Sequence, residues 1–279
     1  MIRTITRRQT LQAMSLIAAG ATLGGCATVR RLFDMDRGII SVKDEQRLGI
    51  RFAERLEADL KIHPSEGVQS YATQLGGRLL ASIDLDPDGA FSFKVIDDAR
   101  TIRASALLGG RVHIYSGLMM MVETEAELAA VIGHEIAHVT ERHMAERLAT
   151  QGGLDELQAY VEQPGTVLPD FVQRVSSQVG QTYLLNFSRM QESAADTLGL
   201  TYTVNAGYNP HRFIDFFERI QIFGASNPNI LSAHPDPVAR IEDIRRFINS
   251  LEDVPDYEGG EAFEQVQVAL WGPGGRPIY

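Results

Sequence analysis

The sequence predicts an α+β domain that is mostly helical, with a small β-sheet beside one central helix. Two kinds of pattern lead to this prediction. Several stretches place apolar residues three, four and seven positions apart, which is the period of a helix with one buried face. Two short stretches instead alternate apolar and polar residues, which is the period of a strand. With 279 residues and 44% apolar content, the chain can bury a real core.

Charge and cysteine content narrow the class of protein. Acidic residues outnumber basic ones by 36 to 26, so the formal net charge is −10. An excess of negative charge argues against nucleic acid as a partner. The single cysteine, Cys26, excludes a disulfide bond within the chain.

Residues 1–25 have the pattern of a signal peptide, so we leave them out of the predicted fold. They hold three arginines, no acidic residue and a mildly apolar stretch, and they end in Leu-Gly-Gly before Cys26. This ending resembles a bacterial lipoprotein signal, which implies cleavage before Cys26 and a lipid on its thiol. The alternative is a buried or free thiol. Residues 6–12 also resemble a twin-arginine export signal, but Thr10 stands where phenylalanine is usual, and the arginines could belong to an ordinary leader.

A lipid anchor would hold the protein on the periplasmic side of a bacterial cell envelope. Because the chain is acidic, charge will not hold it on an anionic membrane, and any anchoring must come from the lipid. Ala27, directly after Cys26, favours the outer membrane over the inner one by resemblance to lipoprotein sorting. We expect residues 26–40 to form a tether and residues 41–251 to form the folded domain.

Two helices and two strands are predicted ahead of the central helix. The helices cover residues 41–61 and 67–82, and each carries an apolar stripe that faces the core. A turn at 86–89 precedes a strand in which alternate residues over 91–95 are apolar. The stretch 107–118 has the pattern of a turn, a short strand and a second turn.

The second predicted strand contains Arg111, Val112, His113 and Ile114. Val112 and Ile114 point to one face of the sheet, and His113 points to the other. A strand just before the central helix could be a sheet edge that pairs with an extended peptide substrate through backbone hydrogen bonds. An ordinary strand inside the sheet is the alternative. We expect His113 to face solvent rather than to bind a metal.

The central helix covers residues 127–139 and places two histidines and one glutamate together. His134 and His138 are four positions apart, so on a helix both imidazoles project from one face, at a distance that suits two corners of a tetrahedral zinc site. Glu135 lies beside the first ligand and can take a proton from an attacking water. The spacing therefore predicts two zinc ligands and a general base. The alternative is a core helix with incidental histidines.

The residues on either side of this helix indicate where it starts and whether a third ligand lies close by in the sequence. Thr124 and Glu127 have the spacing of a capping box at the helix start. His143 lies five positions beyond His138, which on a continuous helix turns it away from the ligand face, so we leave it out of the metal site. The third protein ligand must then come from elsewhere in the chain.

A second helical stretch places Glu192 and Asp196 on one face. Glu192 can be the third metal ligand, and Asp196 can accept a proton from the far nitrogen of a ligating histidine. A solvated acidic face is the alternative. Residues 151–180, which separate this helix from the central one, could be a mobile flap over the site or a surface excursion.

Two further helices and a tail complete the chain. An aromatic-rich helix after residue 210 is expected to pack in the core, and a second helix covers residues 238–251, with Arg240 on its first turn. His234, held in a loop before Pro235, could approach the metal or a developing oxyanion, or could be an ordinary loop histidine. Residues 252–279 are predicted to be a tail with one strand, Gln265 to Trp271.

Five ordered motifs resemble the HtpX/BepA-type zinc metallopeptidases, which belong with the CAAX prenyl endopeptidases among the gluzincins, and the match runs from about residue 41 to 250. The motifs are Gly109-Gly110…Gly117-Leu118, Glu127-Leu128-Ala129, His134-Glu135-x-x-His138-Val139-x-x-Arg142-His143, Arg189-x-x-Glu192-x-x-x-Asp196 and His234-Pro235-x-x-x-x-Arg240-Ile241. The resemblance implies a gluzincin-type domain with one Zn²⁺ per chain. It assigns zinc ligation to His134, His138 and Glu192, the base to Glu135, contact with a ligand to Asp196, and places near the site to His234 and Arg240.

One departure concerns the segment before the double glycine. The family usually has Asn-Ala-Phe-Ala there, whereas this chain has Arg103-Ala104-Ser105-Ala106, which puts the local packing or the substrate edge in doubt. The resemblance implies the stand-alone form of the peptidase, without the membrane spans or helical repeats of some relatives.

The metal motif predicts a zinc-dependent endopeptidase, and the resemblance implies that it acts in the cell envelope on misfolded or misassembled proteins. His234 or Arg240 could assist as a fourth ligand or by stabilising the oxyanion. One alternative is a zinc-stabilised chaperone or assembly factor whose site is closed or inhibited by His234. Another is a zinc hydrolase for cell-wall or other amide bonds. The sequence does not predict the oligomeric state.

Overall fold

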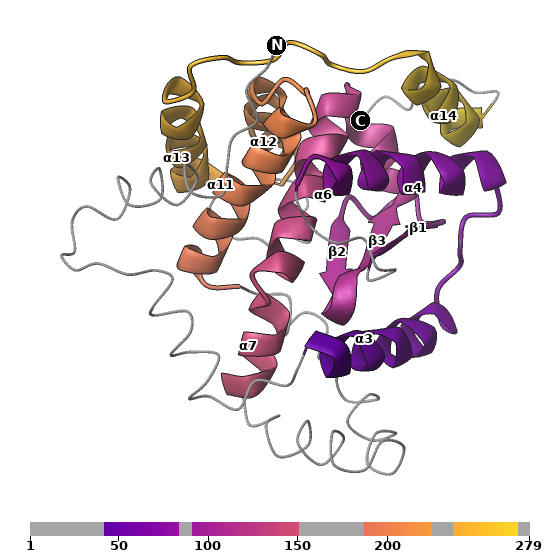
Figure 1. Ribbon diagram of the computed structural model, residues 1–279. Coiled ribbons are helices and arrows are strands. Elements are labelled where there is room, and N and C mark those ends of the chain that lie inside the picture. The colour runs from indigo at the N-terminus through magenta and orange to yellow at the C-terminus, as the bar shows by residue number, and fades with distance from the viewer. Residues whose placement is uncertain (1–41, 84–90, 151–186, 225–236, 273–279) are drawn as a thin grey trace.

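The computed structural model describes residues 42–83, 91–150, 187–224 and 237–272, and it confirms the predicted fold class (Figure 1). Three short strands lie among helices that make up most of the described chain. In order they are α3 (Val42–Glu57), α4 (Glu66–Ala81), β1 (Ser92–Ile96), β2 (Ala104–Leu107), η1 (Leu108–Gly110), β3 (Arg111–Tyr115), α5 (Ser116–Met121), α6 (Glu125–Thr140), α7 (His143–Thr150), α11 (Arg189–Asn205), α12 (His211–Gly224), α13 (Pro237–Asn249) and α14 (Glu261–Trp271). Over the described ranges, every helix is too short or too polar to cross a bilayer.

The sheet has the strand order β1-β3-β2, with β1 parallel and β2 antiparallel to β3. The prediction that residues 111–114 form a sheet edge is therefore wrong, because β3 is paired on both sides. The edge strand that lies against α6 is β2, which the sequence pattern did not indicate. Its four residues, Ala-Ser-Ala-Leu, are all buried, so they show no alternation of polar and apolar side chains.

Helices cover both faces of the sheet. Phe93 on β1 packs against α4, where a Cβ added to Gly76 would lie 2.4 Å from the Phe93 ring, so a larger side chain has no room there. On the opposite face, α3 supplies Glu57, which accepts a hydrogen bond from Lys94 and lies 3.0 Å from Nε2 of His113. His113 is 2% exposed, so the expectation that it faces solvent is wrong. Figure 1 shows α3 and α4 on opposite sides of the strands.

Buried polar contacts fix the start of α6. Oγ1 of Thr124 accepts a hydrogen bond from the backbone N–H of Glu127, as a capping residue should. The Glu127 carboxylate accepts from the N–H of Glu123 rather than from the capping residue, and it forms a bidentate ion pair with Arg219 on α12. Half of the predicted capping box is present, and the second half is replaced by an ion pair that ties α12 to α6.

The first residue of α6 is also buried in a polar cluster. The Glu125 carboxylate accepts hydrogen bonds from the hydroxyls of Tyr71 and Tyr208, at 2.7 and 2.5 Å, and from Arg78 at 2.9 Å. Burial and the adjacent Glu125 carboxylate raise the pKa of both tyrosine hydroxyls, so both stay protonated donors. The cluster joins α4, α6 and the segment before α12.

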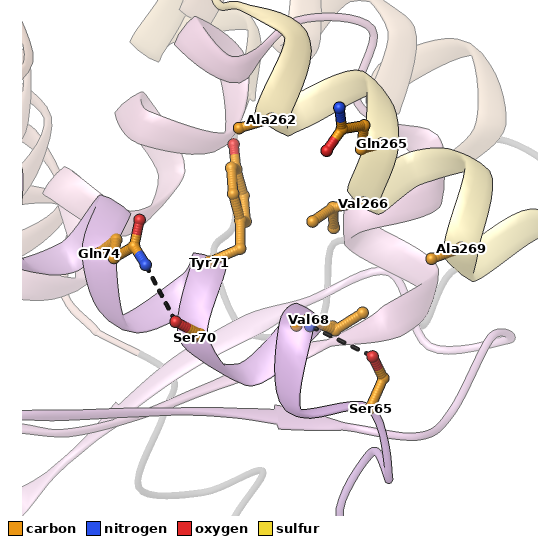
Figure 2. Close-up of a pocket in the computed structure, with 10 residues that line it drawn as sticks. Ser65, Val68, Ser70, Tyr71, Gln74, Ala262, Gln265, Val266 and Ala269 are labelled. Carbon is orange, nitrogen blue, oxygen red and sulfur yellow. Dashed lines mark hydrogen bonds between the residues drawn. The ribbon is translucent and has the colours of Figure 1, made fainter.

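The prediction of a strand from Gln265 to Trp271 is wrong, because these residues belong to α14. Valines and glutamines alternate here, but burial follows the helical period: Phe263 and Val266 are in the core, whereas Val268 is 63% exposed. Because α14 packs on α4 and α5, at least residues 261–271 of the expected tail belong to the folded body. Between α4 and α14 lies a groove of about 360 Å³ with the Tyr71 ring on its wall (Figure 2).

Candidate active site

The site is built where α6 and α11 cross at two glycines. A Cβ on Gly133 would lie 2.8 Å from the carbonyl oxygen of Gly199, and a Cβ on Gly199 would lie 2.6 Å from the backbone nitrogen of His134. Such distances leave room only for glycine at both positions. Figure 1 shows α6 and α11 side by side. The close approach brings Glu192, two turns earlier on α11, to the face of α6 that carries His134 and His138.

His134, His138 and Glu192 form a buried cluster that fits a metal ion. The two histidine Nε2 atoms lie 3.0 Å apart, and each lies 3.7 Å from an oxygen of the Glu192 carboxylate. Two nitrogens and one oxygen around a tetrahedral zinc ion lie about 3.4 Å from one another, so the cluster is close to that geometry. All three side chains are at most 5% exposed. A buried set of two imidazoles and a carboxylate is typical of catalytic zinc sites.

Asp196 lies behind the first histidine. Oδ1 of Asp196 is 2.9 Å from Nδ1 of His134, which leaves Nε2 of His134 directed at the cluster. Burial alone would raise the pKa of Asp196, but the Arg240 guanidinium and His134 hold it well below its usual range. Asp196 is therefore ionised, and its carboxylate can fix the tautomer that presents Nε2 to a metal.

Arg240 on α13 bridges the two carboxylates of α11. Its Nε and Nη2 donate to Asp196 at 2.7 Å each, and its Nη1 lies 2.9 Å from Glu192. The side chain is buried, and its guanidinium lies over the Phe217 ring at 4.6 Å. Arg240 is near the site as expected, but its contacts are those of a residue that positions Glu192 and Asp196. Its expected role as a fourth ligand or oxyanion stabiliser stays a prediction.

Glu135 faces the sheet side of the cluster. Its Oε2 accepts a hydrogen bond of 2.7 Å from the backbone N–H of Ala106 on β2, and its side chain is 2% exposed. A backbone donor holds the carboxylate in one orientation beside the two histidines. The sequence could not show this contact, because a backbone N–H leaves no trace in the residue pattern.

Two aromatic rings enclose His138. Phe187 stacks on its ring with centroids 3.9 Å apart, and Nδ1 of His143 lies 3.0 Å from Nδ1 of His138. The cluster of His134, His138 and Glu192 does not include His143, but His143 touches one of its members. The prediction assumed a continuous helix, whereas α6 ends at Thr140 and a short turn separates it from α7, which begins at His143.

Several predicted features lie outside the described residues. These are Cys26 and the leader, the whole 151–180 segment, and His234. The roles predicted for them stay predictions.

Comparisons with known proteins agree with this geometry. Residues 68–248 match the model of peptidase family M48. The beta-barrel assembly-enhancing protease of Yersinia pestis is 26% identical over 227 residues, which are 77% of this chain and 46% of that protein. The metalloprotease LoiP of Escherichia coli (strain K12) is 27% identical over 149 residues, which are 53% of this chain and 59% of that protein. The mitochondrial metalloendopeptidase OMA1 of Arabidopsis thaliana is 33% identical over 135 residues, 48% of this chain and 27% of that protein. The chain thus spans less than half the length of the assembly-enhancing relative.

Proposed function

Because the chain belongs to peptidase family M48, a family of metal-dependent peptidases, we propose that it is a zinc endopeptidase with its active centre between α6 and α11. The observation that carries this proposal is the buried cluster of His134, His138 and Glu192, whose donor atoms converge with Glu135 beside them. Buried imidazoles and a carboxylate suit Zn²⁺ better than the hard cations, which take oxygen ligands. We expect one Zn²⁺ per chain.

Each group in the site would have a separate role in peptide hydrolysis. When bound by the three ligands, Zn²⁺ would polarise the scissile carbonyl and lower the pKa of an attacking water to about 7. Glu135 would take the proton from this water and later give it to the leaving amine. Asp196 and Arg240 would hold His134 and Glu192 in place, as the ion pairs at 2.7–2.9 Å support.

We propose β2, rather than β3, as the strand that pairs with an extended peptide substrate. Arg103 accepts a hydrogen bond from Tyr115 N–H, and Ser105 is in register with His113, so these residues face β3. The backbone groups of Ala104 and Ala106 then point the other way, toward the Glu135 side. A peptide along this edge would pass beside the general base. Ala104 and Ala106 are each only 4% exposed, so substrate access requires a local opening.

We further propose that the substrates are misfolded or misassembled proteins of the bacterial envelope. Two features support this. The leader before Cys26 resembles a lipoprotein signal, and the Yersinia pestis relative is named for β-barrel assembly. Pairing through backbone groups is largely blind to side chains, which suits unfolded substrates.

Metal removal and restoration test the proposal. The purified chain should lose its cleavage of an unfolded model protein after dialysis against a chelator and regain it with one equivalent of Zn²⁺. Glu192→Gln should no longer hold stoichiometric Zn²⁺, whereas Glu218→Gln on the exposed face of α12 should behave like the parent. If the parent binds Zn²⁺ but cleaves nothing, the site is closed and the chaperone alternative replaces the peptidase.

A further inference from the structure

Helix α3 lies outside the region that matches the family model, which begins at residue 68, yet it reaches the end of the metal-binding helix. Glu45 on α3 is 4% exposed, and its Oε2 lies 2.8 Å from Nε of Arg142. Arg142 is the second residue of the two-residue turn between α6 and α7. A buried carboxylate on α3 is therefore fixed to the joint between these two helices.

That joint has an unusual backbone. Arg142 has φ of 57°, and among the described residues it is the only one besides glycines with a positive φ. A left-handed residue at this point interrupts the helix between α6 and α7, so the side chains of α7 do not keep the register that a continuous helix would give them. The Glu45 carboxylate holds the Arg142 side chain in the position that goes with this backbone. The turn determines the position of the next residue, His143.

His143 returns to the metal-binding cluster because of this turn. Its Nδ1 lies 3.0 Å from Nδ1 of His138, and the ring is 5% exposed. Nε2 of His138 faces His134 and Glu192, so a metal would bind at Nε2 and the proton would reside on Nδ1. His143 is then the acceptor of that proton, just as Asp196 serves His134. Each ligating histidine thus has a partner at its far nitrogen.

Helix α3 is packed closely against η1, so the position of Glu45 on α3 is fixed. A Cβ added to Gly49 would lie 1.8 Å from the carbonyl oxygen of Leu108, and one added to Gly109 would lie 2.5 Å from Cα of Gln46. Backbone therefore packs on backbone between α3 and η1. The Cβ added to Gly109 would also lie 3.0 Å from the carbonyl oxygen of Glu45, so the backbone of Glu45 is part of this contact.

We propose that α3 is part of the metal centre: Glu45 and Arg142 are positioning residues that place His143 against Nδ1 of His138. The inference rests on the proposed function, because it takes His134, His138 and Glu192 as the metal ligands. Beyond the metal ligands and the residues that contact them, the inference adds residues that hold one of those contacts in place, and one of these residues comes from a segment that precedes the matched family region. Loss of any link should weaken metal binding while the ligands themselves are unchanged.

Zn²⁺ affinity, measured on the purified full chain by competition with a chromophoric chelator, tests the proposal. His143→Leu should weaken Zn²⁺ binding by about 10–100-fold, the usual effect of removing a partner of a ligating histidine. His143→Asn, whose carbonyl oxygen replaces the acceptor at Nδ1, should recover most of the affinity. Glu45→Gln should weaken binding by at least about threefold. Its control, Glu54→Gln on the exposed face of the same helix, should bind like the parent.

A double-mutant cycle decides whether Glu45 acts through His143. If it does, Glu45→Gln adds little in the His143→Leu background. Equal effects in both backgrounds, or a Glu45→Gln variant that loses thermal stability but keeps the parent's Zn²⁺ affinity, would overturn the proposal. If Glu45→Gln does not fold, Arg142→Gly removes the same ion pair while tolerating positive φ, and parental affinity there would also contradict it.

The failure of the proposed function would look different from the failure of this inference. A parent chain that binds no Zn²⁺, or a Glu192→Gln variant that binds it as the parent does, would remove the metal site itself. A parent that binds Zn²⁺ through Glu192, with no response to Glu45 or His143, would leave the metal site in place and refute only the role of α3.

Discussion

The close crossing of α6 and α11 predicts that Gly199→Ala lowers the free energy of unfolding. The added Cβ would lie 2.6 and 2.7 Å from the nitrogen and Cα of His134, and 2.8 Å from the carbonyl carbon of Gly133. Ordinary contacts between such atoms are about 3.5–4.0 Å, so the helices would have to separate by about 1 Å. Overpacking of this kind costs about 1–3 kcal/mol of unfolding free energy. It should outweigh the gain of up to about 1 kcal/mol that alanine brings to a helix interior.

Gly77→Ala is the matched control, because Gly77 also lies inside a helix and its added Cβ would meet nothing within 4 Å. Urea unfolding of the metal-free chain should show Gly77→Ala to be more stable than the parent by about 0.5–1 kcal/mol and Gly199→Ala to be less stable. Metal ligands must hold their distances to about 0.2 Å, so Gly199→Ala should also weaken Zn²⁺ binding at least about tenfold. If Gly199→Ala resembles Gly77→Ala in both measurements, the close-packed crossing is not what positions Glu192.

Three further changes follow from the buried polar contacts. Asp196→Asn should weaken Zn²⁺ binding about 10–100-fold by removing the carboxylate at Nδ1 of His134, and an unchanged affinity would contradict this. Burial alone would raise the pKa of Glu57, but His113 and Lys94 hold that pKa below its usual value of 4.5. The ionised Glu57 side chain therefore contributes to the free energy of unfolding above pH 4.5. This contribution is lost as the pH falls through the pKa that Glu57 has in the folded chain. Glu57→Gln should flatten this acid limb in urea unfolding between about pH 3 and 6, and the same slope as the parent would refute it. Tyr208→Phe removes a donor from buried Glu125 and should cost about 1–3 kcal/mol in the same unfolding assay; a parental midpoint would show that the bond contributes nothing.

The spacing of apolar residues along the sequence predicted the helices that bury one face in the core. The helix expected over 67–82 is α4, and the helix around the two histidines is α6. The spacing of His134 and His138 also predicted that their imidazoles would meet, because an i, i+4 pair on a helix has little alternative. These features depend only on neighbours along the chain.

Features that depend on distant parts of the chain were missed. The middle position of β3 follows from pairing with β2, whose small buried residues carry no strand pattern. Valines in α14 fit both a strand and a helix, and only packing on α4 decides between them. His143 was set aside because nothing in the sequence shows that Arg142 has a positive φ. The partners of Glu135 and Arg142 are likewise a backbone N–H and a residue nearly 100 positions away.

The central claim is that Glu135 is the base of a metal-dependent peptidase, and one comparison tests it most directly. Zn²⁺ content and cleavage of an unfolded protein would be measured for the parent chain and for Glu135→Gln, which keeps the shape of the side chain. The account predicts one Zn²⁺ per chain in both proteins and a loss of cleavage of at least about 100-fold in the variant, the low end for a general base. Parental cleavage by Glu135→Gln with its Zn²⁺ still bound would contradict it.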